Sequence, residues 1–114
     1  MKTLISLCLI SVGVAHAAAR PAGNFEFELE PRAIEEICAK LEAGQVFAWR
    51  FEADATLDFN LHWHQGKEVH FAEQRAAVRT GQGEWTAPQA ETYCLMWTAP
   101  ANSKLKLKGW AGVR

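Results

Sequence analysis

Residues 59–71, FNLHWHQGKEVHF, hold the side chains with the clearest capacity for chemistry. Three histidines and a glutamate lie within nine positions around one glycine, namely His62, His64, Glu68 and His70. Imidazole nitrogen and carboxylate oxygen are ligands that Zn²⁺ and Cu²⁺ accept in proteins. The segment therefore predicts one of two structures: a metal site, or the solvated face of an ordinary β-hairpin.

The register of this hairpin decides between them, because a slip of one residue moves every side chain to the other face. A three-residue loop at 65–67 pairs His64 with Glu68 and His62 with His70, and it gathers the apolar residues on the opposite face. We predict this register. Opposed Cβ atoms are then roughly 5 Å apart and second neighbours roughly 7 Å, so the four polar side chains can converge on one ion.

The rest of the chain reads mostly as short strands separated by turn signals. Alternating or continuous apolar residues predict strands at 25–30, 46–51, 58–64, just after Gly66, 84–87, 92–98 and 104–108. Six or more such strands predict an all-β fold, a small antiparallel β-sandwich or barrel. Residues 74–83 are polar and glycine-rich, and we expect a connection there.

The segment 32–43 has two interpretations. Ile34, Ile37, Cys38 and Leu41 have helical spacing, yet the segment is short and Gly44 ends it. The sequence leaves helix and strand open.

Charge and aromatic patterns give two further expectations. Lys104, Lys106 and Lys108 either pair with Glu26, Glu28 and Glu30, if the first and last strands are neighbours, or attract an anionic partner. The positions of Trp49, Trp63 and Trp97 on apolar strand faces predict core packing. Trp85 and Trp110 lie nearer turns and are the candidates for exposed ligand contacts.

The N-terminus has the pattern of an export signal. Lys2, the apolar run 4–14 and Ala15-His16-Ala17 predict a signal peptide at 1–17 and a single domain at 18–114, placed in the periplasm or secreted. No later segment is apolar and long enough to cross a membrane. Without Lys2, 11 basic and 13 acidic residues remain, and this net charge of −2 argues against nucleic-acid binding.

Cys38 and Cys94 remain in the exported domain, and export favours one disulfide between them over two buried thiols. Nucleophilic catalysis has little support, because Ser103 is the single serine after residue 17 and no histidine lies near it or either cysteine in sequence. We therefore expect no catalytic residue.

The order of these segments resembles the GOLD (Golgi dynamics) domain over roughly residues 38–113. The resemblance lies in LEAGQVFAWRFEA after Cys38, then FNLHWHQGKEV, a glycine-containing connection, and YCLMWTAPANSKLKLKGW. It implies a β-sandwich, similar to a jelly roll, that binds proteins or lipids and is not catalytic. In one branch of that family a disulfide joins an early strand to the late strand, and Cys38 and Cys94 fall at those places.

His62, His64 and Glu68 also resemble the first cupin motif, H-x-H-x3-4-E. Thr56 and Arg75 stand where its flanking glycines would fall, and no histidine follows residue 70 to supply the second motif. The resemblance implies a metal-dependent enzyme, with less support than the GOLD resemblance.

The sequence thus predicts an exported, non-catalytic binding module of GOLD-like type that requires no cofactor and has an unidentified protein or lipid ligand. The alternative is a small exported protein that binds Zn²⁺ or Cu²⁺ through His62, His64, His70 and Glu68.

Overall fold

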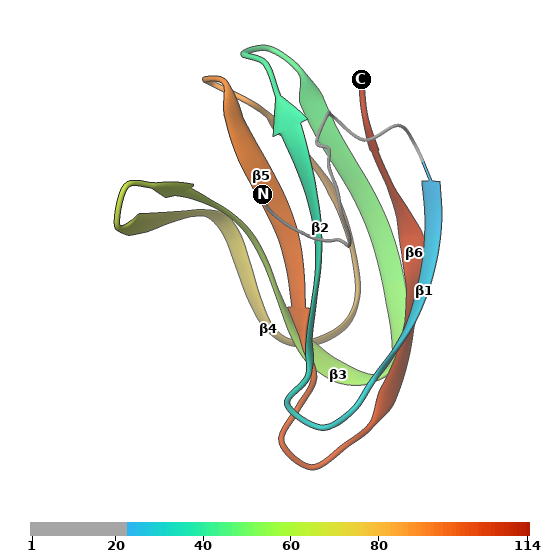
Figure 1. Ribbon diagram of the computed structural model, residues 1–114. Coiled ribbons are helices and arrows are strands. Elements are labelled where there is room, and N and C mark those ends of the chain that lie inside the picture. The colour runs from blue at the N-terminus through green and yellow to red at the C-terminus, as the bar shows by residue number, and fades with distance from the viewer. Residues whose placement is uncertain (1–22) are drawn as a thin grey trace.

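A computed structural model describes residues 23–114, and the predicted signal peptide lies outside them. This part of the chain forms antiparallel strands and contains no helix (Figure 1), so the predicted all-β fold is confirmed. The six strands are β1 (Gly23–Leu29), β2 (Ile34–Leu41), β3 (Val46–Gln65), β4 (Glu68–Thr86), β5 (Glu91–Thr98) and β6 (Leu105–Val113).

The strands form one curled sheet in the order β1-β6-β3-β5-β2, with β4 on the other edge of β3. Strand β3 changes partner along its length: Phe47–Ala53 pairs with β6, and Asp58–His62 pairs with β5. The two halves of the curled sheet face each other as the layers of a sandwich. Phe25 of β1 and Trp97 of β5 show this, because their ring centroids lie 5.1 Å apart although β1 and β5 are not paired.

Alternating residues of β3 build the core between the two layers. Phe47, Trp49 and Phe51 are buried in its first half and Phe59 and Leu61 in its second. Full burial of an aliphatic or aromatic side chain of this size is worth roughly 1.5–3 kcal/mol.

The prediction that some tryptophans are buried and others exposed is confirmed only in part. Trp49 and Trp97 are buried in the core as predicted, and Trp63 is half-buried against it. Trp85 stacks on Trp63 with ring centroids 5.7 Å apart, so it also packs on the core and is not an isolated surface ring. Trp110 is half-buried.

The first and last strands are neighbours, which is the condition for the expected pairing of lysines with glutamates. Glu26 lies opposite Lys108 and Glu28 opposite Lys106 in the β1–β6 register. Outside the strands, Lys104 Nζ lies 3.9 Å from a carboxylate oxygen of Glu30. Lys108 Nζ forms its ion pair with Glu52 of β3, at 3.3 Å, and exposed ion pairs of this kind contribute little stability.

The open question over residues 32–43 is resolved as a strand, β2. Ile37 and Leu41 pack toward the core, whereas Ile34 and Cys38 lie on the outer face of the sheet. A helix would have placed all four residues on one side. Strand β2 is an edge strand paired only with β5, so its outer face needs no continuous apolar cover.

The predicted polar connection at 74–83 is wrong, because these residues belong to β4. β4 pairs only with β3, so its outward side chains can be polar. Its two inner glycines lie beneath aromatic rings: a Cβ on Gly81 would stand 2.5 Å from Cε2 of Phe51, and one on Gly83 would stand 2.7 Å from Cζ2 of Trp49. The glycines therefore make room for the core instead of marking a loop.

Candidate functional site

The β3–β4 hairpin that carries the histidines turns over two residues, Gly66 and Lys67. Gln65 pairs with Glu68 across the turn, and Gly66 has a φ of 61°, a backbone conformation that favours glycine. In Figure 1 the tips of the two strands project from the body of the sheet. The hairpin is therefore an arm supported by the sheet at one end only.

The predicted register of this hairpin is wrong by one residue. His64 lies opposite Val69 and Trp63 opposite His70, where we expected His64 opposite Glu68. Two-residue loops with a positive φ match the twist of a hairpin best. An irregularity in the ladder between Leu61 and His62 absorbs the extra residue, so Leu61 stays in the core while the hairpin takes this register.

The shift divides the four predicted ligands between two faces. His62 and His64 lie on the outer face with ring centroids 5.2 Å apart. His70 lies on the opposite face, stacked on Trp63, and its Nε2 is 3.3 Å from a carboxylate oxygen of Glu68. The structure thus brings the four residues together only as two separate pairs. Metal binding by His62, His64, Glu68 and His70 stays a prediction.

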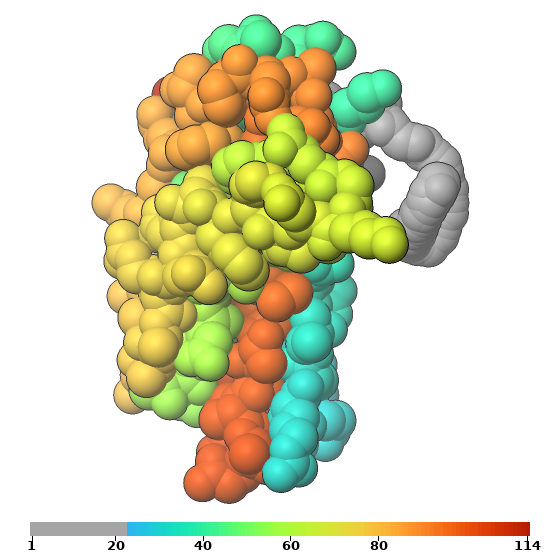
Figure 2. All heavy atoms as spheres, turned by 90° about the vertical axis from the view of Figure 1, so that its left-hand side faces the viewer, coloured from blue at the N-terminus to red at the C-terminus, as the bar shows by residue number. Residues whose placement is uncertain are grey.

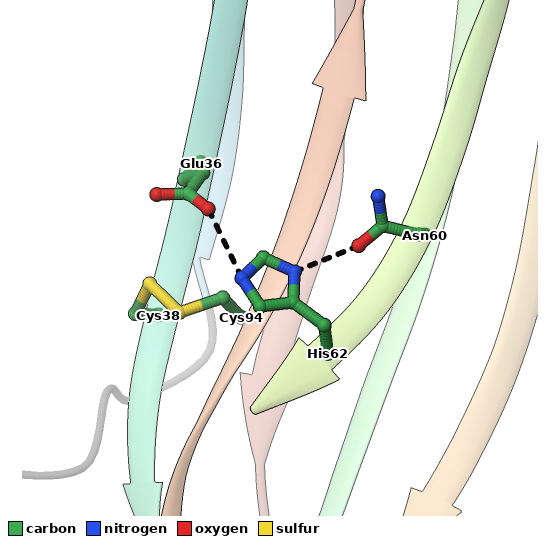
Figure 3. Close-up of polar contacts among 5 residues, drawn as sticks. All are labelled: Glu36, Cys38, Asn60, His62 and Cys94. Carbon is green, nitrogen blue, oxygen red and sulfur yellow. Dashed lines mark hydrogen bonds and ion pairs between the residues drawn. A yellow bond between two sulfur atoms is a disulfide. The ribbon is translucent and has the colours of Figure 1, made fainter. Parts of the chain in front are cut away.

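His62 is the one buried polar side chain in the described part of the chain, with 4% of its surface exposed. Its Nδ1 lies 2.7 Å from Oδ1 of Asn60, the residue two positions earlier on the same face. Its Nε2 lies 3.3 Å from a carboxylate oxygen of Glu36 on β2 (Figure 3). Burial, and next the neighbouring His64, lower the pKa of His62.

Glu36 reaches this histidine across a strand. β5 lies between β2 and β3, with Met96 opposite both Glu36 and Asn60, and Cys94 opposite His62. Burial raises the pKa of the Glu36 carboxyl, and the nearby His64 acts in the other direction. The acid and the imidazole therefore face each other over the outer surface of β5.

The predicted disulfide forms one wall of this cluster. Cys38 and Cys94 lie directly opposite each other on β2 and β5 and are joined by a bond. One ligand atom each from Glu36, His62 and Cys94 lies within 4.8 Å of the others, the one such group among the described residues. Since its sulfur is bonded to Cys38, Cys94 offers no thiolate, and the free donors here are Glu36 and His62.

Sequence reasoning missed Glu36 and Asn60 as site residues. Glu36 stands 26 positions before His62, and only the strand order β2-β5-β3 brings the two together. Asn60 had a local signal, because a polar side chain two positions before His62 must share its face in a strand.

A second feature of the hairpin is exposed apolar surface. Val69 and Phe71 are 44% and 46% exposed, and they lie opposite His64 and His62 on the outer face. We call His64, Val69 and Phe71 the hairpin patch. Figure 2 views the molecule from the side to which the arm points and shows the yellow-green hairpin residues standing in front of the sheet.

A charged groove of about 890 Å³ lies elsewhere, over β1, β6 and the middle of β3 and β4. Charges of both signs line it, and they include one ion pair, between Lys108 and Glu52. Asp54 accepts hydrogen bonds from the backbone N–H of Lys106 at 2.8 Å and, through its carbonyl, from Arg79 at 3.2 Å, and Lys108 Nζ lies 3.3 Å from Glu52. The groove thus has no concentrated charge of one sign.

Comparison with known proteins gives a likeness in fold. No family model matches the chain, so neither the GOLD nor the cupin resemblance is confirmed. No curated protein matches its sequence. The fold is similar to the crystal structure of Aeromonas hydrophila PliG, a periplasmic lysozyme inhibitor of g-type lysozyme, with a TM-score of 0.61 and 13% identity over 89% of this chain and 93% of that chain.

At that identity the likeness to PliG shows a shared fold and nothing finer. It extends over nearly all of both chains, so the curled six-stranded sheet as a whole is the shared unit. Residues 23–114 hold no helix of the length and hydropathy that crossing a bilayer requires.

Proposed function

We propose that this chain is an exported, non-catalytic protein-binding module, and that its partner is a lysozyme whose activity it inhibits. The observation that carries the proposal is the likeness to PliG over nearly the full length of both chains. One fold can serve many functions, so the proposal needs support from particular residues as well.

The hairpin patch supports a protein partner. Phe71 and Val69 stand on a projecting arm and are 46% and 44% exposed. Apolar side chains gathered on an accessible surface mark protein interfaces, and aromatic residues contribute most to the affinity there. His64, opposite Val69 and nearer the turn than Phe71, adds a polar contact.

The surroundings of His62 support binding over catalysis. Its two nitrogens face Asn60 and Glu36, and its neighbouring cysteine is held in a disulfide, so the ring has neither a hydroxyl nor a free thiol to activate. The disulfide and the signal-like residues 1–17 both support export to an oxidising compartment.

The test is an inhibition assay with the purified, oxidised protein. Cell-wall lysis by lysozymes of the g, c and i types is measured while the protein is titrated from substoichiometric amounts to a hundredfold excess. We expect the lysis rate of at least one type to fall to near zero at about one equivalent. Unchanged rates for all three types would overturn the proposal, and binding to lipid vesicles in that case would favour the lipid ligand that the GOLD resemblance implies.

A pair of matched variants then locates the interface. Phe71→Asp should weaken inhibition at least tenfold, because the charge replaces an exposed aromatic contact on the arm. Ile34→Asp is the control, since Ile34 is also an exposed apolar residue, at 57%, but starts β2 away from the hairpin. Equal losses for both variants would show that the effect is not specific to the hairpin patch.

A further inference from the structure

We infer that Glu36, His62 and His64 form a binding site for a single transition-metal ion with the ligand preferences of Zn²⁺ or Cu²⁺. This site differs from the one that the sequence predicts, because Glu36 of β2 replaces Glu68 and His70 of the hairpin. It shares His64 with the hairpin patch, but Glu36 and His62 lie outside that patch, so Glu36→Gln tests the metal site without changing the patch.

The first argument is the orientation of the His62 ring. The amide oxygen of Asn60 faces Nδ1 at 2.7 Å, and an amide oxygen can only accept a hydrogen bond, so Nδ1 carries the proton. In the neutral ring Nε2 then has a free lone pair, and this lone pair faces a carboxylate oxygen of Glu36 at 3.3 Å. Two acceptors that face each other need a proton or a metal ion between them, and an imidazole with a carboxylate is a pair of ligands that Zn²⁺ and Cu²⁺ accept.

The second argument is that this arrangement is the usual support for a metal-bound histidine. A ligating imidazole donates its other N–H to a carbonyl or carboxylate, which fixes both the tautomer and the ring orientation. Asn60 supplies that acceptor for His62, and the burial of His62 holds the ring in place. The free nitrogen is thus already presented toward Glu36 without rearrangement.

The third argument is the position of His64. Its ring lies edge-on to that of His62, with an interplanar angle of 89° and centroids 5.2 Å apart. Because Zn²⁺ binds each imidazole nitrogen at roughly 2 Å, two rings on one tetrahedral ion have centroids roughly 5 Å apart. The ligand atoms of His64 do not lie within 4.8 Å of both Glu36 and His62 in this structure, so metal binding requires the exposed His64 ring to turn toward them.

The three side chains are of the types that bind Zn²⁺ or Cu²⁺, and the site is accessible to solvent. Two imidazoles and one carboxylate suit Zn²⁺ or Cu²⁺ and leave one coordination position for water. Cys94 lies in the same cluster, but its bond to Cys38 excludes a thiolate ligand. The Glu36 side chain is 40% exposed, so an ion can enter from that side even though His62 is covered.

The chain contains its own matched control. Glu68 and His70 form a second Glu–His pair with the same 3.3 Å separation between Nε2 and a carboxylate oxygen, on the opposite face of the hairpin. That pair lacks an Asn partner for the imidazole among the hydrogen bonds of the described residues, and its ring is stacked on Trp63. If any Glu–His pair at this distance bound metal, both pairs would bind it equally.

The experiment is a titration of the oxidised full-length protein with ZnCl₂ and with CuCl₂, followed by calorimetry and native mass spectrometry. We expect one ion per chain, with affinity reduced at least tenfold by Glu36→Gln and by His64→Ala. Both substitutions are at exposed side chains, so the variants should fold, and circular dichroism checks this. Glu68→Gln and His70→Ala should change the affinity less than twofold.

Three results would overturn the inference: no bound ion at 100 micromolar free metal, an affinity unchanged by Glu36→Gln, or an affinity lost in the Glu68 and His70 variants instead. A nuclear magnetic resonance spectrum of the imidazole nitrogens adds a second readout. Zinc should shift Nε2 of His62 and leave Nδ1 protonated, and the reverse pattern would also contradict the proposed geometry.

Discussion

Trp63 and His70 stack across the β3–β4 hairpin, with ring centroids 5.5 Å apart and ring planes 17° apart. The contact occupies the inner face of the arm, where Trp63 also packs on Trp85 and Tyr93. A register one residue away would move His70 to the other face, so this stack helps to fix the register.

His70→Ala should therefore lower the free energy of unfolding by about 0.5–1.5 kcal/mol, the usual contribution of a stacked pair. Urea denaturation measures the loss. His64→Ala, at an exposed ring on the other face of the same hairpin, should change stability by less than about 0.5 kcal/mol in metal-free buffer. If His64→Ala lowered the free energy of unfolding as much as His70→Ala, the loss could not be attributed to the stack of His70 on Trp63.

Gly109→Ala should be among the most damaging single changes in β6. An added Cβ would collide with the backbone oxygen of Arg50, and it would stand 2.9 Å from Cα of Phe51, both on the paired strand β3. Backbone held in a ladder cannot move aside, so we expect a loss of about 2–3 kcal/mol in thermal or urea unfolding. Gly23→Ala is the control, because its Cβ would meet nothing within 4 Å. A tolerated Gly109→Ala would contradict the close approach of β6 to β3.

Removal of the disulfide should cost about 4 kcal/mol, because the bond closes a loop between residues 56 positions apart and restricts the unfolded chain. The double variant Cys38→Ala/Cys94→Ala and the reduced wild-type protein should show the same loss in urea denaturation. This is a large share of the roughly 5–15 kcal/mol that stabilises a typical domain. A loss below about 1 kcal/mol in both samples would mean that the sheet alone sets the stability.

Stability should also fall as the pH drops below about 6.5. Burial lowers the pKa of His62 below its ordinary value of 6.5, so between the two pKa values the unfolded chain binds more protons than the folded one. Protons then favour unfolding, and the free energy of unfolding decreases as the pH falls through this window. Above pH 6.5 the effect is absent.

The groups that face His62 are Glu36, Asn60, His64 and the disulfide, and Glu36 acts in the opposite sense. Because burial raises its pKa above 4.5, Glu36 favours the folded state at low pH and loses this contribution as the pH rises. The contribution of His62 is isolated by comparing wild type with His62→Gln in a chelator-containing buffer from pH 5 to 8. We expect a flatter profile in the variant, and identical profiles would contradict the assignment.

The fold follows from the sequence where one periodic pattern dominates. Phe47, Trp49 and Phe51 recur at every second position, and this pattern predicts a strand with one apolar face. The opposite charges of 26–30 and 104–108 suggest a pairing that depends on the first and last strands being neighbours, and the β1–β6 register meets that condition.

The predictions for β4 and for the hairpin register were wrong for two different physical reasons. An edge strand needs few apolar residues, so residues 74–83 look like a loop, and the glycines that suit a turn here fit beneath Phe51 and Trp49. The hairpin register depends on an irregularity in the ladder next to Leu61, and apolar alternation assumes an uninterrupted ladder.

The candidate site was predictable only in part. His62 and His64 share a face because they are two positions apart in a strand, and the sequence predicts this directly. Glu36 joins them because β5 lies between β2 and β3, and no local pattern encodes strand order. Sequence reasoning thus found one side of the cluster and could not find the other.

The position of β6 has a consequence for how the chain folds. β6 follows the other five strands along the chain yet lies between β1 and β3. Strand β1 therefore has no partner until β6 has formed. Until then the edges of β1 and β3 that pair with β6 are both exposed, and exposed strand edges readily pair with other chains. Folding of this half of the protein therefore ends with its C-terminal segment, and a chain cut before Leu105 would expose an aggregation-prone surface.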